Sequence, residues 1–197
     1  CASLRERESD LKYRVFCDSA PVFERAWGVR AGLGFIGKNS FLISKKHGLH
    51  TLIGVILINK EVLYGEIERE GCGACRRCID ACPVNAILSP KVIDSRRCIS
   101  YQTIESRRMR HEEEFPASKG EWMFGCDVCL NACPWSSRGE ISSWECFQPL
   151  LHGEPGKFIT ETSDKIWLDM EDGYFNKWFK NSPLMRAGLN KIKENIK

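Results

Sequence analysis

The cysteines of this sequence are spaced as they are in proteins that bind metal clusters. Cys72, Cys75, Cys78 and Cys82 form a C-x2-C-x2-C-x3-C run, and Pro83 follows it. Bacterial ferredoxins use this run to hold 4Fe–4S clusters, with three thiolates on one cluster and the fourth on the other. The short gaps let a tight loop wrap around one cluster, and the proline then redirects the chain because it cannot continue a helix. The run therefore predicts an iron–sulfur site.

A second cysteine run lacks one member of this pattern. Cys126, Cys129 and Cys133, with a proline after the last, match the second, third and fourth positions of the first run. The first position falls on Met123, and a methionine cannot replace a thiolate there. The missing ligand must therefore come from elsewhere. The best candidate is Cys98, which lies between the two runs.

Crossing the ligands, as two-cluster ferredoxins do, assigns eight thiolates to two 4Fe–4S clusters with none left over. The predicted ligands of the first cluster are Cys72, Cys75, Cys78 and Cys133, and those of the second are Cys82, Cys98, Cys126 and Cys129. Structural zinc is the weaker alternative, because its paired hooks usually have longer spacers and often include histidine. The odd total of eleven cysteines argues against a disulfide framework. We expect the remaining three to be free thiols: Cys1, Cys17 and Cys146.

The composition is that of an ordinary globular protein. The chain has 197 residues, of which 43% are hydrophobic and 28% charged, and its formal net charge is +3. No apolar run reaches the roughly 18–20 residues that span a bilayer, and the longest, at 51–58, predicts a buried strand. The arginines between positions 96 and 110 predict a solvated helical face, with a phosphate-contacting patch as the alternative. The chain starts at Cys1 and shows no targeting signal, so we expect a fragment or a missing N-terminal segment.

The segment before the cysteine runs predicts a small α+β layer with a sheet of its own. A strand around positions 15–16 leads through D-S-A-P into an amphipathic helix over 21–32, and strands follow over 40–44 and 51–59. By itself Asp18 is interpreted as a helix cap, and Arg25 returns to the same helix face two turns later. The glycine-rich stretch before Lys38 lacks the Ser or Thr of a P-loop, because Asn39 follows. It favours a tight turn or a close approach to a flat cofactor.

Four motifs in this order resemble those of a known enzyme family. They are "DSAPVFERAWGVRAGLGFIGKNS", "GCGACRRCIDACPVNAI", "CISYQTIE" and "GCDVCLNACPW", and together they span positions 16–135. The combination resembles epoxyqueuosine reductase, a cobalamin-dependent family with two 4Fe–4S clusters. The resemblance implies reduction of the epoxide on a modified base at the wobble position of tRNA.

The resemblance also implies roles for particular residues. Asp18 in D-S-A-P matches the family's proton donor, and we expect burial beside an apolar corrin to raise its pKa. Arg25 matches an arginine near the substrate. The implied cobalamin contacts are Asp18, Lys38, Asn39, Ser100, Thr103 and Asp127. The implied partners are tRNA and a low-potential electron donor, and we expect a monomer in the cytoplasm with no membrane association.

The predicted fold class is α+β, in three parts. An α/β cobalamin-binding layer, incomplete at its N-terminus, covers 1–66, and a ferredoxin-like module with two 4Fe–4S clusters covers 67–136. A short helical extension covers 137–197. There, apolar residues at helical spacing behind a Ser-Pro start predict a packing helix, with lysines facing RNA as the alternative: Met185, Leu189, Ile192 and Ile196.

Two other functions fit part of the pattern. A reductive dehalogenase uses the same cofactors, although its proton donor is typically a tyrosine and not an aspartate in D-S-A-P. A non-catalytic two-cluster electron carrier would leave the motif around Asp18 unexplained. Tyr101 and Trp135 could stack on a flipped base, or they could be buried aromatics beside the clusters.

Overall fold

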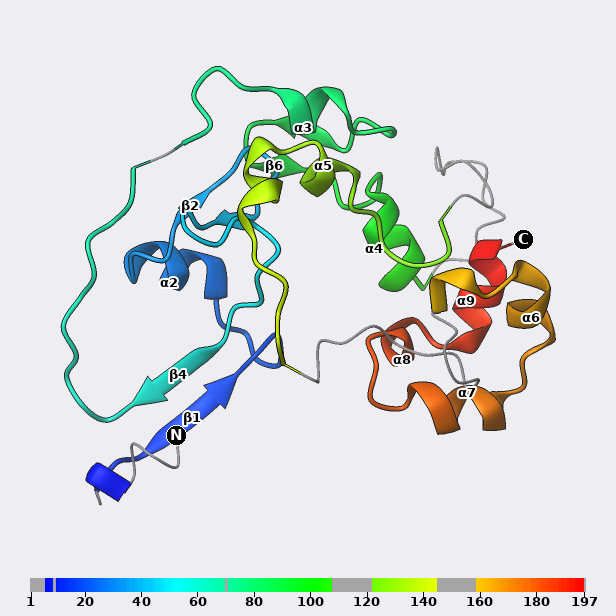
Figure 1. Cartoon of the computed structure of the whole chain (residues 1–197), viewed down its shortest axis with the longest axis horizontal. Helices are drawn as coiled ribbons and strands as arrows, with labels where there is room; N and C mark the ends of the chain where they lie inside the picture. Colours follow the sequence, from blue (N-terminus) through cyan, green and yellow to red (C-terminus); the bar gives the residue numbers. More distant parts are fainter. Residues whose placement is uncertain (1–5, 9, 70, 108–121, 145–158, 197) are drawn as a thin grey trace.

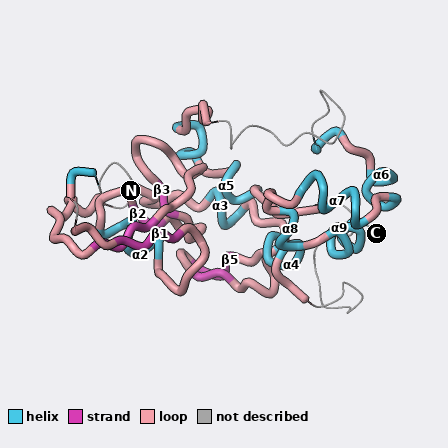
Figure 2. The backbone as a smooth tube through the Cα atoms, turned by 90° about the horizontal axis from the view of Figure 1, so that it is seen from below, coloured by secondary structure: helices cyan, strands magenta, loops and turns pink. Residues whose placement is uncertain are grey.

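The structure is a computed structural model that describes residues 6–8, 10–69, 71–107, 122–144 and 159–196. Among these residues, strands and helical segments form the N-terminal part, short helices and strands form the cysteine-bearing middle, and helices form the C-terminal part (Figure 1). Seen from below, the strands of the N-terminal part lie toward one end of the molecule and the last helices lie at the other (Figure 2). The mixture of helices and strands confirms the predicted α+β class.

The strands form separate two-stranded ribbons in place of the one N-terminal sheet that was expected. β1 (Tyr13–Phe16) pairs antiparallel with β4 (Val55–Ile58), and Phe16 lies opposite Val55. β2 (Phe35–Ile36) pairs antiparallel with β3 (Leu42–Ile43). The β2–β3 ribbon requires glycine at position 34, because a Cβ there would lie 2.1 Å from the carbonyl oxygen of Ile43. The predicted strand over 51–59 is thus shortened to its second half.

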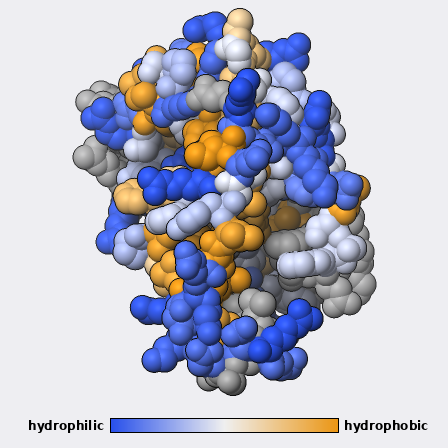
Figure 3. Space-filling model, turned by 90° about the vertical axis from the view of Figure 1, so that its left-hand side faces the viewer, coloured by the Kyte–Doolittle hydropathy of each residue, from blue (hydrophilic) through white to orange (hydrophobic). Residues whose placement is uncertain are grey.

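The prediction that this apolar run is a buried strand was wrong for the chain described here. Ile56 and Leu57 are 48% and 50% exposed, and Val15 on the paired strand is 55% exposed. A strand with apolar side chains on both faces is normally covered on both faces. The described residues supply no such cover for β1 and β4, and apolar patches lie among the charged residues on this side of the molecule (Figure 3).

Helix α2 (Glu24–Arg30) starts later than the sequence predicted. Phe23 is its N-cap residue and makes no side-chain capping bond, so the interpretation of Asp18 as a helix cap was wrong. Instead, residues 18–23 make tight turns, in which the Val22 N–H donates to the Ala20 carbonyl at 2.7 Å. Asp18 itself has a φ of 53°, a left-handed conformation that a residue inside a right-handed helix does not adopt.

The middle of the chain is made of short elements around the cysteines. They are α3 (Arg77–Asp80), β5 (Ile87–Ser89), β6 (Val92–Ile93), α4 (Ile99–Ile104), α5 (Val128–Asn131) and the 3₁₀ helix η1 (Pro134–Arg138). One core joins Phe35, Ile43 and Leu49 of the N-terminal part to Leu130 of α5, with three cysteines packed against it. The N-terminal and middle parts therefore share a core, and the domain boundary at 66 stays a prediction.

The C-terminal part has a core of its own. It comprises η3 (Ile159–Glu161), α6 (Asp164–Asp169), α7 (Asp172–Phe179), α8 (Leu184–Ala187) and α9 (Leu189–Ile196). Trp167 stacks on Phe179 with ring centroids 5.6 Å apart, and Leu189 and Ile192 are buried, as their spacing predicts. None of the helices in the described ranges is both long and apolar enough to cross a membrane.

The single helix predicted near the C-terminus is divided in two. Gly188 has φ 78° and ψ 159°, a conformation that is essentially restricted to glycine, and it separates α8 from α9. Met185 consequently lies 39% exposed and does not continue the buried face of α9.

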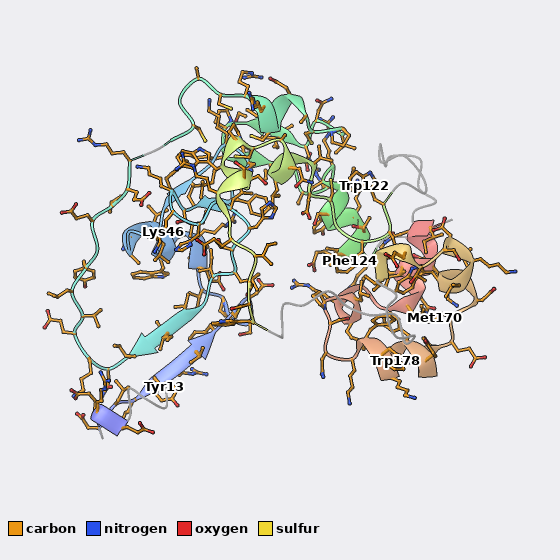
Figure 4. All side chains as sticks on the ribbon, viewed as in Figure 1. Tyr13, Lys46, Trp122, Phe124, Met170 and Trp178 are labelled. Carbon is orange, nitrogen blue, oxygen red and sulfur yellow. The ribbon has the colours of Figure 1, made fainter. Side chains whose placement is uncertain are left out.

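The C-terminal helices are tied to the middle part by buried polar and apolar contacts. The Asn195 side chain donates to the carbonyl oxygens of Thr103 and Met123 at 2.9 and 2.8 Å. Met123 and Phe124 pack against the C-terminal core, while Trp122 packs against the core beneath α4 (Figure 4). Met123, the residue in the place of a cysteine, thus points to the helices and not to the cysteines.

Candidate functional site

Four of the predicted cluster ligands line one cavity. Cys72, Cys75, Cys78 and Cys133 contribute to a cavity of about 250 Å³. The first two lie in a turn before α3, where the Cys75 N–H donates to the Cys72 carbonyl at 2.9 Å. Cys78 lies on α3, and Cys133 is the N-cap residue of η1. Three cysteines of the first run therefore meet the last cysteine of the second run.

The other four predicted ligands line a second, larger cavity. Cys82, Cys98, Cys126 and Cys129 contribute to a cavity of about 470 Å³ with a mainly apolar lining. Cys98 is the N-cap residue of α4, and Cys129 lies on α5. The structure thus brings Cys98 to the position that the incomplete second run leaves open.

Some of the thiols in each cavity are electrostatically unfavourable as bare thiolates. Burial, followed by repulsion from Cys126 and Cys98, raises the pKa of Cys129 to about 12. Burial is also the main cause of the raised pKa of Cys78, where Cys133 and Cys72 of the same cavity add to it. Bound iron would supply the positive charge that these thiolates need, because metal ligation requires the deprotonated thiol.

The donor set and its arrangement fit iron–sulfur clusters better than single ions. Each cavity has four cysteines and no histidine among its lining residues. Within the described ranges, no three His, Cys, Asp or Glu side chains converge on a point as ligands of one metal ion would. Thiolates that bind separate corners of a four-iron cube lie around a cavity, as these do.

The predicted cofactor contacts divide between the two cavities. Ser100 and Asp127 line the larger cavity together with Phe41 and Tyr101. Lys38 and Asn39 line the smaller cavity instead. The Lys38 ammonium group donates to the carbonyl oxygens of Gly73 and Cys75 at 2.7 and 2.8 Å.

Asn39 and Thr103 are buried and connect backbone segments through side-chain hydrogen bonds. Asn39 is 1% exposed, and its amide donates to the Cys129 carbonyl at 3.3 Å. Thr103 is also 1% exposed and is not among the residues that line either cavity. Its hydroxyl donates to the Ile99 carbonyl at 2.9 Å and accepts the Gly125 N–H at 3.0 Å, next to Cys126.

The predicted proton donor lies away from both cavities. The side chain of Asp18 is 81% exposed, and its carboxylate accepts a hydrogen bond from Nη1 of Arg186 at 2.9 Å. The expected burial of Asp18 is therefore not found in the chain by itself. Arg25 donates to the carbonyl of Ser40, so it braces the loop between β2 and β3.

Sequence reasoning did not identify Arg186 and Glu105 as residues of this region. Arg186 also donates through Nε to Glu105 at 2.7 Å, and Glu105 is both the C-cap residue of α4 and a lining residue of the larger cavity. The two carboxylates raise the pKa of the Arg186 guanidinium, Glu105 more than Asp18. Because 168 positions separate Asp18 from Arg186, no local spacing could have indicated the pair.

The remaining predicted residues are placed as follows. Trp135 is half-buried, with its ring edge-on to Phe35 at 5.7 Å, whereas Tyr101 is 40% exposed on the larger cavity. Arg96 pairs with Asp94 at 3.0 Å. Cys17 is an exposed free thiol. Outside the described residues lie Cys1, Cys146, Arg108 and Arg110.

Comparison with known protein families identifies a known domain in the middle of the chain. A family described as "4Fe-4S double cluster binding domain" matches residues 71–136. An epoxyqueuosine reductase from Cyclobacterium marinum is 39% identical over 194 residues, which cover 98% of this chain and 59% of that protein. The chain is a homologue of the epoxyqueuosine reductases.

A second epoxyqueuosine reductase, from a Synechococcus species, is 44% identical over 183 residues, covering 93% of this chain and 54% of the relative. The chain therefore spans little more than half the length of these curated relatives. A solved structure of epoxyqueuosine reductase with an epoxyqueuosine-modified tRNA-Tyr stem loop has the same fold, with a TM-score of 0.87. That match is 24% identical and covers 99% of this chain and 50% of the solved chain.

The similarity to known proteins and the two cavities both indicate iron–sulfur clusters in the middle of the chain. The matched family segment contains all eight cysteines that line the two cavities. The family resemblance that the four sequence motifs predicted is thereby confirmed.

Proposed function

We propose that the protein reduces epoxyqueuosine to queuosine at the wobble position of tRNA, as a cobalamin-dependent enzyme with two 4Fe–4S clusters. The observation that carries this proposal is the larger cavity. One part of its lining holds four cysteines, and another holds Ser100, Asp127 and the exposed Tyr101. A cluster and a flat cofactor would meet there within a single space. The homologous reductases supply the reaction and the substrate.

The cysteines hold the clusters in the crossed arrangement. Cys72, Cys75, Cys78 and Cys133 bind the first cluster, and Cys82, Cys98, Cys126 and Cys129 bind the second. The clusters supply single electrons at low potential. Because α3 and α5 each carry a ligand of one cluster and are followed by a ligand of the other, the two cavities are held at a fixed spacing.

The mainly apolar lining of the larger cavity is suited to an apolar ring cofactor. Phe41, Val84 and Ile87 would provide apolar contact, and Ser100 and Asp127 would provide polar groups. Cobalamin, when bound, supplies a strongly reducing cobalt centre for attack on the epoxide. The protein's part is to orient the cofactor and to exclude water from the apolar side.

Asp18 provides the proton in this proposal. Its carboxyl group donates a proton to the epoxide oxygen and is reprotonated from water. A second proton from water then lets that oxygen leave as water, once both carbon–oxygen bonds are broken and two electrons have been delivered. Arg25 contributes to substrate binding from the neighbouring helix. Lys38, Asn39 and Thr103 support the cofactor indirectly, because they hold the loops that carry the cysteines.

The partners and setting follow from the same proposal. The substrate is a tRNA anticodon loop, and the electrons come from a low-potential donor. We propose a monomer acting in the cytoplasm, where tRNA is modified, without association with a membrane.

The test is anaerobic turnover of the full-length protein. The protein is reconstituted with iron, sulfide and cobalamin, and then supplied with a low-potential reductant and tRNA carrying epoxyqueuosine. Mass spectrometry of the digested nucleosides should show the loss of one oxygen. Asp18→Asn should abolish conversion while iron and cobalamin stay bound. Asp10→Asn is the matched control, because Asp10 is an exposed aspartate ahead of the same strand and pairs with Lys60 at 2.8 Å.

The other outcomes separate the alternative functions. Bound cobalamin without conversion of epoxyqueuosine would direct the search to other substrates, including organohalides. Bound clusters with no uptake of cobalamin would leave a two-cluster electron carrier. Conversion that survives in Asp18→Asn would retain the reductase and reject this residue as its acid.

A further inference from the structure

Arg186 connects the proposed proton donor to the rim of the larger cavity. Its guanidinium lies between two carboxylates, with Asp18 at 2.9 Å and Glu105 at 2.7 Å. The three residues come from the loop after β1, the end of α4 and helix α8. One positive charge therefore faces two negative charges, and the group as a whole keeps a net negative charge.

This ion pair network contributes little to the stability of the fold. The side chains of Arg186, Asp18 and Glu105 are 54%, 81% and 38% exposed. Ion pairs at such exposed positions are easily broken, because water competes for both partners. A weak contact between remote segments suits a residue that changes partners better than one that holds the molecule together.

The two ends of the network differ in how firmly they are held. Glu105 follows α4, whose Ile99 and Thr103 are buried, and α8 is anchored through the buried Leu184. Asp18 lies in a turn-rich loop with a φ of 53°, where a non-glycine residue is strained. Arg186 and Glu105 thus form the fixed end, and Asp18 is the partner that can leave.

The observed pairing holds Asp18 outside the proposed reaction space. Arg186 donates its N–H to Oδ2 of Asp18, and Asp18 is not among the residues that line the larger cavity. A general acid must reach the group that it protonates. The Asp18–Arg186 contact must therefore open before the reaction, and the incoming group that can replace a carboxylate on a guanidinium is another oxyanion. RNA supplies such groups as backbone phosphates, which arginine binds through charge-assisted hydrogen bonds.

We propose that Arg186 is a positioning residue that exchanges Asp18 for a backbone phosphate of the RNA substrate. Without RNA it holds Asp18 beside the end of α4; with RNA it binds phosphate and releases the Asp18 loop. The freed carboxyl group then takes a proton from water and turns toward the substrate. This inference rests on the proposed function, because it assumes that the substrate is RNA and that Asp18 is the acid.

RNA binding measures the exchange without any need for turnover. The probe is a tRNA anticodon stem loop, titrated at several salt concentrations into the reconstituted full chain. Arg186→Gln should weaken binding and lower the slope of log affinity against log salt by about 0.7–0.9, the effect of one lost phosphate contact. Asp18→Asn should strengthen binding by roughly two- to fivefold, because the competing carboxylate is removed. Arg186→Lys should restore part of the salt slope.

Hydrogen exchange reports the release of the loop. The Val22 and Glu24 amides donate within the loop, so their exchange follows its order. We expect faster exchange in Arg186→Gln than in the wild type, and RNA should accelerate exchange in the wild type but not in the variant. Arg76→Gln is the matched control, since Arg76 is 61% exposed and pairs with Asp80 near the other cavity. It should leave loop exchange unchanged.

The possible results test the exchange at Arg186 separately from the proposed function. Wild-type affinity, salt slope and loop exchange in Arg186→Gln would overturn the exchange, even if the enzyme reduces epoxyqueuosine. The expected shifts in binding and loop exchange would support the exchange, even if turnover persists in Asp18→Asn and that residue is rejected as the acid. A wild-type protein that does not bind the stem loop would overturn both the exchange and the proposed substrate.

Discussion

Single residues decide how many clusters the protein holds, and Cys98 is the most informative of them. It completes the four cysteines of the larger cavity although it belongs to neither run. Cys98→Ser should therefore reduce bound iron by about half and leave one cluster, because a 4Fe–4S cluster needs four thiolates. Iron and sulfide analysis with electron paramagnetic resonance of the reduced protein measures this. Cys17→Ser, which changes an exposed free thiol, should retain both clusters. An unchanged iron content in Cys98→Ser would assign the fourth ligand elsewhere.

The buried thiols also make a prediction about the metal-free protein. With the pKa of Cys129 raised to about 12 by burial, only roughly 1 in 10,000 of these thiols is ionised at pH 8. Alkylation requires the thiolate, so Cys129 should react on the order of a thousandfold more slowly than an exposed cysteine in a reference peptide. Its rate should rise about tenfold per pH unit between pH 8 and 10. Peptide mapping by mass spectrometry gives both rates, and equal rates would contradict the raised pKa.

Residues that act through local spacing were predictable, and residues that act across the fold were not. The cysteine runs reveal their role because neighbouring ligands must lie within one tight loop. Cys98 could then be chosen as the missing ligand from the few cysteines outside the runs, because it lies between them. Lys38 and Asn39 were expected at a cofactor, but their side chains reach carbonyls of the cysteine loops. Arg186 carried no signal at all, because its partners Asp18 and Glu105 are brought to it only by the packing of α8.

Elements were predicted well where one face is buried and poorly where the backbone turns. Leu189 and Ile192 were correctly assigned to a packed helical face. The break at Gly188 was missed, because helical spacing continues across it in the sequence. The start of α2 was placed too early, since the D-S-A-P stretch has the composition of a helix cap but forms tight turns.

The break between α8 and α9 gives a matched pair of glycine substitutions. A Cβ at Gly188 would meet no atom within 4 Å, so Gly188→Ala adds backbone strain without a steric clash. It should destabilise the α9 amides by about 1–3 kcal/mol. Gly173→Ala places the same methyl group in open space on helix α7, where the φ is not positive, and should stabilise it by about 0.5–1 kcal/mol. Native-state hydrogen exchange distinguishes the two, and effects of equal sign would show that strain at Gly188 is unimportant.

At the scale of the whole molecule, the cysteines are part of the hydrophobic interior in two of the three cores. One core packs against Cys72, Cys129 and Cys133, and another packs against Cys82, Cys98 and Cys126. Among the residues that the structure describes, no cysteine packs against the C-terminal core of Trp167, Phe175, Phe179 and their neighbours. Clusters that bridge short helices thus replace the large apolar side chains that such small elements would otherwise need.

This division predicts that the two parts of the molecule respond differently when the clusters are removed. Chelation of iron should lower the protection of the amides of α3, α4 and α5 through more frequent local opening, without abolishing their packing, because their cores include cysteines that no longer have a metal partner. The amides of α7 and α9 should keep most of their protection, since aromatic and aliphatic side chains pack that core. Hydrogen exchange of the holo and chelated full chain, resolved by peptide, tests this directly. Cys98→Ser should show an intermediate pattern, with α4 exposed and the β2–β3 core retained around the first cluster. Simultaneous loss of protection in α5 and α9 would mean that the Asn195 contacts to Thr103 and Met123 couple the two parts into one cooperative unit.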